Sequence, residues 1–160
     1  MTEKEIEALA LGFLELGVAE GDFIAIIGRN RPYFYWTMVA AQSVGAVPVP
    51  VYQDSAAEEM AYVLGHCGAK YVVAEDQEQV DKVIDVQDQL SDFDQMVYLD
   101  PRGMRKYEHG QLPQFRPLTD KGSAANAKNA QHLNEISTTP HNDRPRHNLT
   151  TSSTTSPTQG

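Results

Sequence analysis

Residues 23–51 contain two short apolar segments on either side of a helical segment, and few folds accommodate that order. Residues 23–27 form an unbroken apolar run, which is typical of a strand that is covered on both faces. Residues 33–44 predict a helix, because Pro32 suits its first turn and Gly45 suits the position just after its end. The stretch therefore predicts a strand–helix–strand unit.

The second strand of this unit, residues 47–51, alternates valine with proline. Pro48 and Pro50 have no N–H group and cannot donate to the hydrogen-bond ladder of a sheet. The sequence therefore predicts that this strand is interrupted or lies at an edge.

Strands and helices continue to alternate as far as residue 99. The sequence predicts further strands at 71–74 and 96–99, helices at 56–66 and after Asp76, and a helix that precedes residue 17. Strands that alternate with helices at this spacing form a parallel sheet with right-handed crossovers. The predicted fold class is α/β: a partial doubly wound parallel sheet of about four strands, β-α-β-α-β-α-β, with a preceding helix.

The composition of the chain changes after Arg116, where Asn, Ser, Thr, His, Pro and Gln replace the periodic apolar pattern. Ordering the backbone of residues 117–160 would cost at least ~40 kcal/mol of entropy. The four large aliphatic side chains in this stretch each offer at most ~3 kcal/mol on burial. We therefore expect an α/β domain at 1–116 and a disordered or degenerate tail at 117–160.

Charge and cysteine content exclude several classes of partner and site. The chain has 22 acidic and 13 basic residues, and all of the acidic excess lies before residue 117. This charge argues against a nucleic-acid partner or an anionic membrane surface. Cys67 is the only cysteine, so an internal disulfide and a cysteine-based zinc site are excluded, and no other metal site is predicted. No apolar run is long enough to span a membrane and no signal peptide is recognisable, so a cytoplasmic protein is expected.

A parallel α/β sheet binds ligands at the carboxyl ends of its strands, and the first such loop spans residues 28–32. The loop contains neither a dinucleotide fingerprint nor a P-loop. Arg29 and Arg31 could hold an anion there, or they could be solvated or pair with Asp22 or Asp54.

Two other groups of side chains are candidates for a ligand-binding or catalytic role. The aromatic residues Tyr33, Phe34 and Trp36 could line an apolar ligand cavity or simply pack on the sheet or a neighbouring helix. The carboxylates of residues 75–81 suit a solvated helix start, where negative charge complements the helix dipole. No acid–base pair or nucleophile–base arrangement is present, so no catalytic residue is predicted.

Several motifs in order resemble one family. The segments are Leu16-Gly17-Val18-x-x-Gly21-Asp22, then Asn30-Arg31-Pro32 with Trp36, and then Gly45-Ala46-Val47-Pro48-Val49-Pro50. Together they resemble the AMP-forming acyl-CoA synthetases of the adenylate-forming superfamily. The segments Tyr52-Gln53-Asp54-Ser55, Glu59 to Leu64, Glu75 to Lys82 and Asp100 to Gly103 resemble the long-chain fatty acid–CoA ligase branch.

The resemblance covers about residues 8–107 and implies a two-step reaction. A fatty acid and ATP give an acyl-adenylate, and coenzyme A then gives the thioester, with Mg²⁺ assisting. Members of this family are several times longer than this chain. The resemblance therefore implies a fragment that lacks the adenine-binding segments and the catalytic lysine, and that binds none of ATP, Mg²⁺ or CoA by itself.

The last residues can be compared with the family's phosphate loop. In an alignment without gaps, Thr151, Ser152, Thr154, Thr155 and Gly160 match the loop. Ser153 and Ser156 replace glycines, and Gln159 replaces the lysine, so backbone freedom and a positive charge are lost. These five matches are either a degenerate remnant of the loop or a chance similarity of a Ser/Thr-rich tract. The first alternative implies a decayed or wrongly read gene segment from about residue 117 onward.

The sequence thus predicts an inactive fragment of a long-chain fatty acid–CoA ligase. The alternative is a non-catalytic α/β module that binds a complete ligase or another partner. The sheet would have an open edge that is paired with another strand in the full enzyme. Self-association through this edge is therefore expected.

Overall fold

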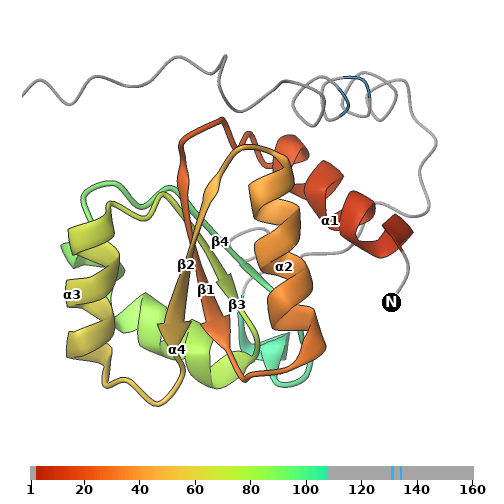
Figure 1. The fold of residues 1–160 in the computed structure, drawn as a ribbon. Coiled ribbons are helices and arrows are strands. Elements are labelled where there is room, and N and C mark those ends of the chain that lie inside the picture. Colours follow the sequence, from red (N-terminus) through yellow and green to blue (C-terminus); the bar gives the residue numbers. More distant parts are fainter. Residues whose placement is uncertain (1–2, 108–130, 132–133, 135–160) are drawn as a thin grey trace, which may run out of the picture.

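The computed structural model describes residues 3–107, 131 and 134, and it contains a parallel sheet with helices on both faces (Figure 1). The elements are α1 (Glu3–Glu15), β1 (Phe23–Gly28), α2 (Pro32–Ser43), β2 (Val47–Tyr52), α3 (Ala57–Cys67), β3 (Tyr71–Ala74), α4 (Gln77–Val86), η1 (Gln87–Gln89), β4 (Gln95–Tyr98) and η2 (Met104–Lys106). The expected α/β fold with a preceding helix is confirmed. The expected tail at 117–160 lies outside the described residues apart from positions 131 and 134.

The four strands are ordered β2-β1-β3-β4, and every neighbouring pair is parallel. Phe23 of β1 lies opposite Val47 of β2, and Ile24 of β1 lies opposite Tyr71 of β3. The chain therefore moves outward from β1 to β2, crosses back over β1 to β3, and continues outward to β4. This reversal of direction defines a doubly wound sheet.

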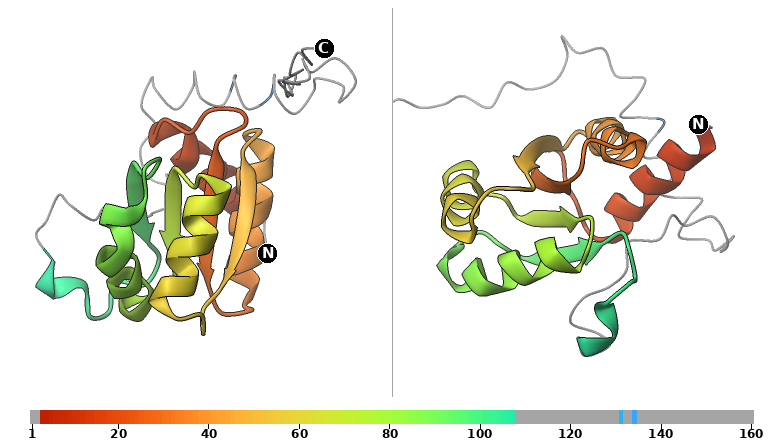
Figure 2. Two further views of the ribbon diagram at one scale, coloured as in Figure 1. Left: turned by 90° about the vertical axis from the view of Figure 1, so that its left-hand side faces the viewer. Right: turned by 90° about the horizontal axis from the view of Figure 1, so that it is seen from below.

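Each face of the sheet has its own hydrophobic core. Ile24 and Ile26 of β1 pack in a cluster with side chains of α1 and α2, whereas Ala25 and Ile27 pack with side chains of α3 and α4. Figure 2 shows the sheet between these two helical layers. These four residues of β1 are almost completely buried, which explains why apolar and polar residues do not alternate along the strand.

The proline-containing strand β2 is uninterrupted and lies at the edge of the sheet, so the second of the two predicted outcomes is confirmed. The N–H of Val47 donates to the Asp22 carbonyl oxygen beside β1, at 2.9 Å. Because backbone groups alternate along a strand, the positions of Pro48 and Pro50 face the free edge. The two missing N–H groups therefore leave that edge with few donors for another strand.

No helix in the described part of the chain is long and apolar enough to cross a membrane. Cys67 is the last residue of α3 and is half-buried. Its thiol donates to the Leu64 carbonyl oxygen at 3.4 Å, and burial raises the pKa of the thiol.

We predict that the double substitution Pro48→Val/Pro50→Val increases self-association, because it adds two outward N–H donors to the β2 edge without changing the apolar character of the strand. Sedimentation velocity at increasing protein concentration would measure the change. Pro101→Ala, which removes a proline from the loop after β4, serves as the control. An unchanged monomer–oligomer distribution in the double variant would show that the prolines do not protect this edge.

Candidate ligand crevice at the ends of β1 and β3

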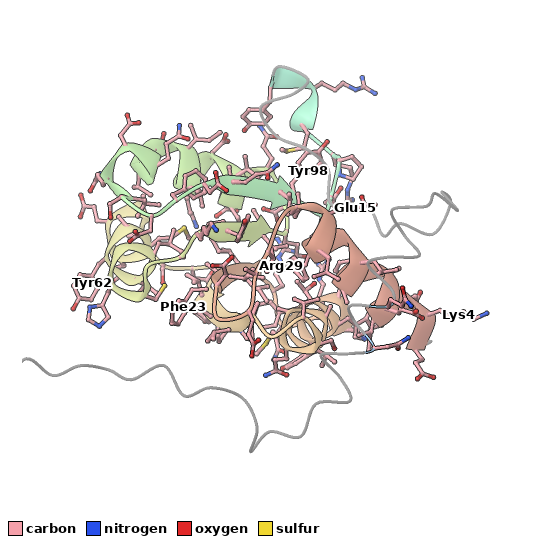
Figure 3. All side chains as sticks on the ribbon, turned by 90° about the horizontal axis from the view of Figure 1, so that it is seen from above. Lys4, Glu15, Phe23, Arg29, Tyr62 and Tyr98 are labelled. Atoms are coloured by element: carbon pink, nitrogen blue, oxygen red, sulfur yellow. The ribbon has the colours of Figure 1, made fainter. Side chains whose placement is uncertain are left out.

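A crevice is expected where the two central strands send the chain in opposite directions. After β1 the chain passes through α2 on one face of the sheet, and after β3 it passes through α4 on the other face. The loops diverge at this point, and open α/β sheets bind ligands there. Arg29, the first residue after β1, lies near the centre of Figure 3, which looks roughly along the strands.

The Glu75 carboxylate, from the loop after β3, occupies this crevice. Its Oε2 accepts a hydrogen bond from the backbone N–H of Arg29, and its Oε1 lies 3.3 Å from Nη1 of Arg31. The Glu75 N–H donates to the Ile27 carbonyl oxygen at 2.9 Å, which continues the ladder between β3 and β1. The Glu75 side chain is 18% exposed, whereas that of Arg31 is 55% exposed.

Gly28 makes room for this carboxylate. A Cβ atom at position 28 would lie 2.9 Å from Glu75 Oε2 and 3.0 Å from Glu75 Cβ. Contacts that short do not occur in well-packed proteins, so any larger residue at this position would displace the Glu75 side chain or the loop.

The loop after β4 completes the rim of the crevice. Arg102 donates from its backbone N–H and from Nε to Asp100 Oδ1, at 2.9 and 3.0 Å. These hydrogen bonds, together with the positive charges of Arg102 and Arg31, lower the pKa of the Asp100 carboxyl. The enclosed space is ≈ 320 Å³, and its charged lining includes Arg29, Arg31, Glu75, Asp76, Asp100 and Arg102.

A second, more apolar hollow of ≈ 450 Å³ lies on the β2 side of the same loop. Its lining includes Phe34, Tyr35, Pro50, Val51 and Tyr52, together with Arg29 and Asn30. Tyr35 donates its hydroxyl hydrogen to Asn30 Oδ1 across the start of α2. The carboxyl ends of β1 and β2 thus carry an apolar surface, while the ends of β1, β3 and β4 carry a charged one.

The structure corrects the partners expected for the arginines. Arg31 pairs with Glu75 rather than with Asp22 or Asp54, and Asp22 instead pairs with Lys70 at 3.4 Å. Sequence reasoning missed Glu75, because strand order, which brings residue 75 beside residue 29, was not predicted. In the described part of the chain, the guanidinium of Arg29 has no ion-pair partner.

The aromatic residues of α2 pack on the sheet and on a neighbouring helix, which is the second of the two alternatives. Tyr33, Phe34 and Trp36 are partly buried against the cluster formed by α1, α2 and the sheet. The rings of Tyr33 and Trp36 are 5.7 Å apart. Phe34 additionally lines the apolar hollow, so for this residue both alternatives apply.

The carboxylates at the start of α4 have different environments, although a solvated helix start was expected for all of them. Asp76 caps α4 by accepting from the Gln79 N–H at 3.3 Å, and Glu78 pairs with Lys82 at 3.1 Å. Asp81 accepts from the Tyr107 hydroxyl, and burial together with this hydrogen bond raises the pKa of Tyr107 to about 12. Glu75 is the exception, because it is turned into the crevice.

The described residues contain no group of three or more His, Cys, Asp or Glu side chains that could hold a metal ion. The candidate phosphate-loop residues Thr151, Ser152, Thr154, Thr155 and Gly160 lie outside the described part of the chain.

We predict that Gly28→Ala lowers the free energy of unfolding by ~1–3 kcal/mol, because the added methyl group collides with Glu75. Gly65→Ala is the matched control: it lies inside α3, and the nearest atom to its new Cβ, in Leu90, is 3.9 Å away. The control is expected to gain ~0.5–1 kcal/mol, as glycine replacements within helices do. Urea unfolding would measure both, and equal effects of the two substitutions would contradict the packing at Gly28.

Comparison with known proteins places this architecture in a family. A segment of 79 residues is 39% identical to an uncharacterized protein of Mycobacterium tuberculosis, covering 49% of this chain and 45% of that protein. A segment of 81 residues is 36% identical to a long-chain-fatty-acid–CoA ligase of Xenopus laevis, covering 51% of this chain but 11% of the ligase. The chain thus spans less than half the length of each of these relatives.

Solved structures agree with this result. A putative long-chain-fatty-acid CoA ligase from Rhodopseudomonas palustris matches with a TM-score of 0.58 and 29% identity, covering 69% of this chain and 26% of that one. An acetoacetyl-CoA synthetase from Streptomyces lividans matches with a TM-score of 0.63 and 16% identity, covering 75% and 20%, and shows the fold alone. The model of the AMP-binding enzyme family matches residues 2–160. The resemblance to acyl-CoA synthetases is therefore confirmed, and the chain belongs to the AMP-binding enzyme family.

Proposed function

We propose that this chain is a portion of a long-chain fatty acid–CoA ligase, an enzyme that converts a fatty acid, ATP and CoA to acyl-CoA, AMP and pyrophosphate. The observation that carries the proposal is the 36% identity to the Xenopus laevis ligase over 81 residues. In this proposal the segment supplies a structural layer of the enzyme, the sheet with its helices.

The chain alone is proposed to be inactive. Within its described part, the charged groups of the crevice other than Arg29 form ion pairs or a helix cap rather than an acid–base pair, and no group of three or more His, Cys, Asp or Glu side chains fits a magnesium ion. ATP, Mg²⁺ and CoA are therefore assigned to the intact enzyme and not to this polypeptide.

The proposed boundary between domain and tail lies at residues 116 and 117. The family model extends to Gly160, which supports the interpretation of Thr151, Ser152, Thr154, Thr155 and Gly160 as a degenerate phosphate loop. Ser153, Ser156 and Gln159 would still prevent tight phosphate binding, because two glycines and a lysine are replaced.

Two further proposals concern the setting of the protein. A cytoplasmic location is proposed, which agrees with the finding that no described helix could span a membrane. Self-association is proposed to involve β4, the edge strand that has no proline, because β4 pairs with β3 on one side only among the described strands.

We predict that the purified chain forms no acyl-CoA from palmitate, ATP and CoA in the presence of Mg²⁺. A full-length long-chain fatty acid–CoA ligase under the same conditions is the positive control, with the thioester measured by mass spectrometry. Calorimetric titration with ATP·Mg²⁺ is expected to give no heat of binding. Thioester formation that requires both ATP and CoA would overturn the proposed inactivity, and heat of binding would argue for a working phosphate loop.

We also predict that removal of residues 117–160 changes the midpoint of thermal unfolding by less than ~2 °C, because the residues that the structure describes between 3 and 107 already form two hydrophobic cores. Circular dichroism of the full chain and of the 1–116 variant would make the comparison. A large fall in the midpoint would show that the tail contributes to the folded domain.

The second candidate is a non-catalytic α/β module that binds a partner. The matched 79 residues form 45% of the Mycobacterium tuberculosis relative, so that protein is close to this chain in length. A second short protein that contains this segment supports the second candidate. Sedimentation of the chain with a purified full-length ligase distinguishes the two candidates. A stoichiometric complex would favour the module, and independent sedimentation would favour the inactive portion.

A further inference from the structure

The crevice between the ends of β1 and β3 is the place where a doubly wound sheet receives a ligand, yet a side chain of this chain already lies in it. Glu75 is held there through its backbone as well as its side chain. Its N–H donates to Ile27 at 2.9 Å, and its carbonyl oxygen accepts from the Asp100 N–H at 2.8 Å. Position 75 is therefore fixed between the loops that follow β1 and β4.

The carboxylate of Glu75 makes the contacts that a bound oxyanion would make. One oxygen accepts from the Arg29 backbone N–H, and the other lies 3.3 Å from the Arg31 guanidinium. Gly28 lets the carboxylate approach the end of β1, where an added Cβ would collide with Glu75 Oε2. A backbone donor, a guanidinium and a glycine are the usual components of a site for a small anion.

The surrounding charges do not compete for these donors. Asp100 is engaged by Arg102, Asp76 caps α4, and Glu78 pairs with Lys82. Glu75 is thus the carboxylate that contacts both residues of this loop, through the backbone N–H of Arg29 and the guanidinium of Arg31. Arg29 also lines the same ≈ 320 Å³ space, and its guanidinium has no ion-pair partner in the described residues.

We propose that Glu75 is an internal occupant of the crevice, which closes it to diffusible oxyanions, and that removal of its carboxylate uncovers a binding site for one. The proposal is independent of the ligase assignment, since it depends only on contacts within the described sheet. The intact chain then binds no phosphate at this crevice, although the strand order provides a place for it.

The test is a titration of the full chain and its variants with inorganic phosphate at constant ionic strength, followed by the NMR shift of the Arg29 amide. Glu75→Ala is expected to bind phosphate at least about tenfold more tightly than the unchanged chain. Glu75→Ala/Arg31→Ala is expected to lose most of that gain, because the guanidinium that pairs with the carboxylate is absent.

Glu78→Ala is the matched control, since it removes another carboxylate from the lining of the crevice without emptying the position beside Arg29 and Arg31. It is expected to leave phosphate affinity unchanged. If Glu75→Ala does not fold, Glu75→Gln replaces it, because the amide keeps the size of the side chain and loses the charge. The proposal is overturned if the folded Glu75 variant binds phosphate no better than the unchanged chain, or if Glu78→Ala gains as much.

Discussion

Burial of both faces of the central strands is the constraint on which this structure depends. Ile24 and Ile26 face one helical layer, and Ala25 and Ile27 face the other, so none of these four positions of β1 can be polar. β3 is buried in the same way along its whole length. Neither layer of helices can be removed without exposing half of these side chains to water, so the α1–α2 layer and the α3–α4 layer are required together.

That constraint also explains why the local features were predictable and the crevice was not. Strands and helix ends were predictable because each is marked by a few consecutive residues. The marks are the apolar runs of β1 and β3, Pro32 at the start of α2 and Gly45 after its end. Gly45 has φ 78°, as expected for the residue after a helix. The pairing of Arg31 with Glu75 depends on β3 lying beside β1, and strand order is a property of the whole sheet. An acidic residue directly after a buried strand was the available signal, but its charge suited a helix start equally well.

The charged rim and the apolar hollow have a common origin in the sheet. Parallel strands bring all their carboxyl ends to one edge, so the loops after β1, β3 and β4 meet there and place four acidic and three basic side chains in one small region. Within this region Arg31 pairs with Glu75, and Arg102 pairs with Asp100.

The two borders of the sheet are chemically unequal. Along β2, the outward backbone positions 48 and 50 are prolines, whereas the outward positions of β4 are Met96 and Tyr98, which retain their N–H groups. A further strand would therefore find all backbone N–H donors beside β4, but it would lack two of them beside β2. We therefore expect a larger protein that contains this sheet to add strands beside β4 and not beside β2.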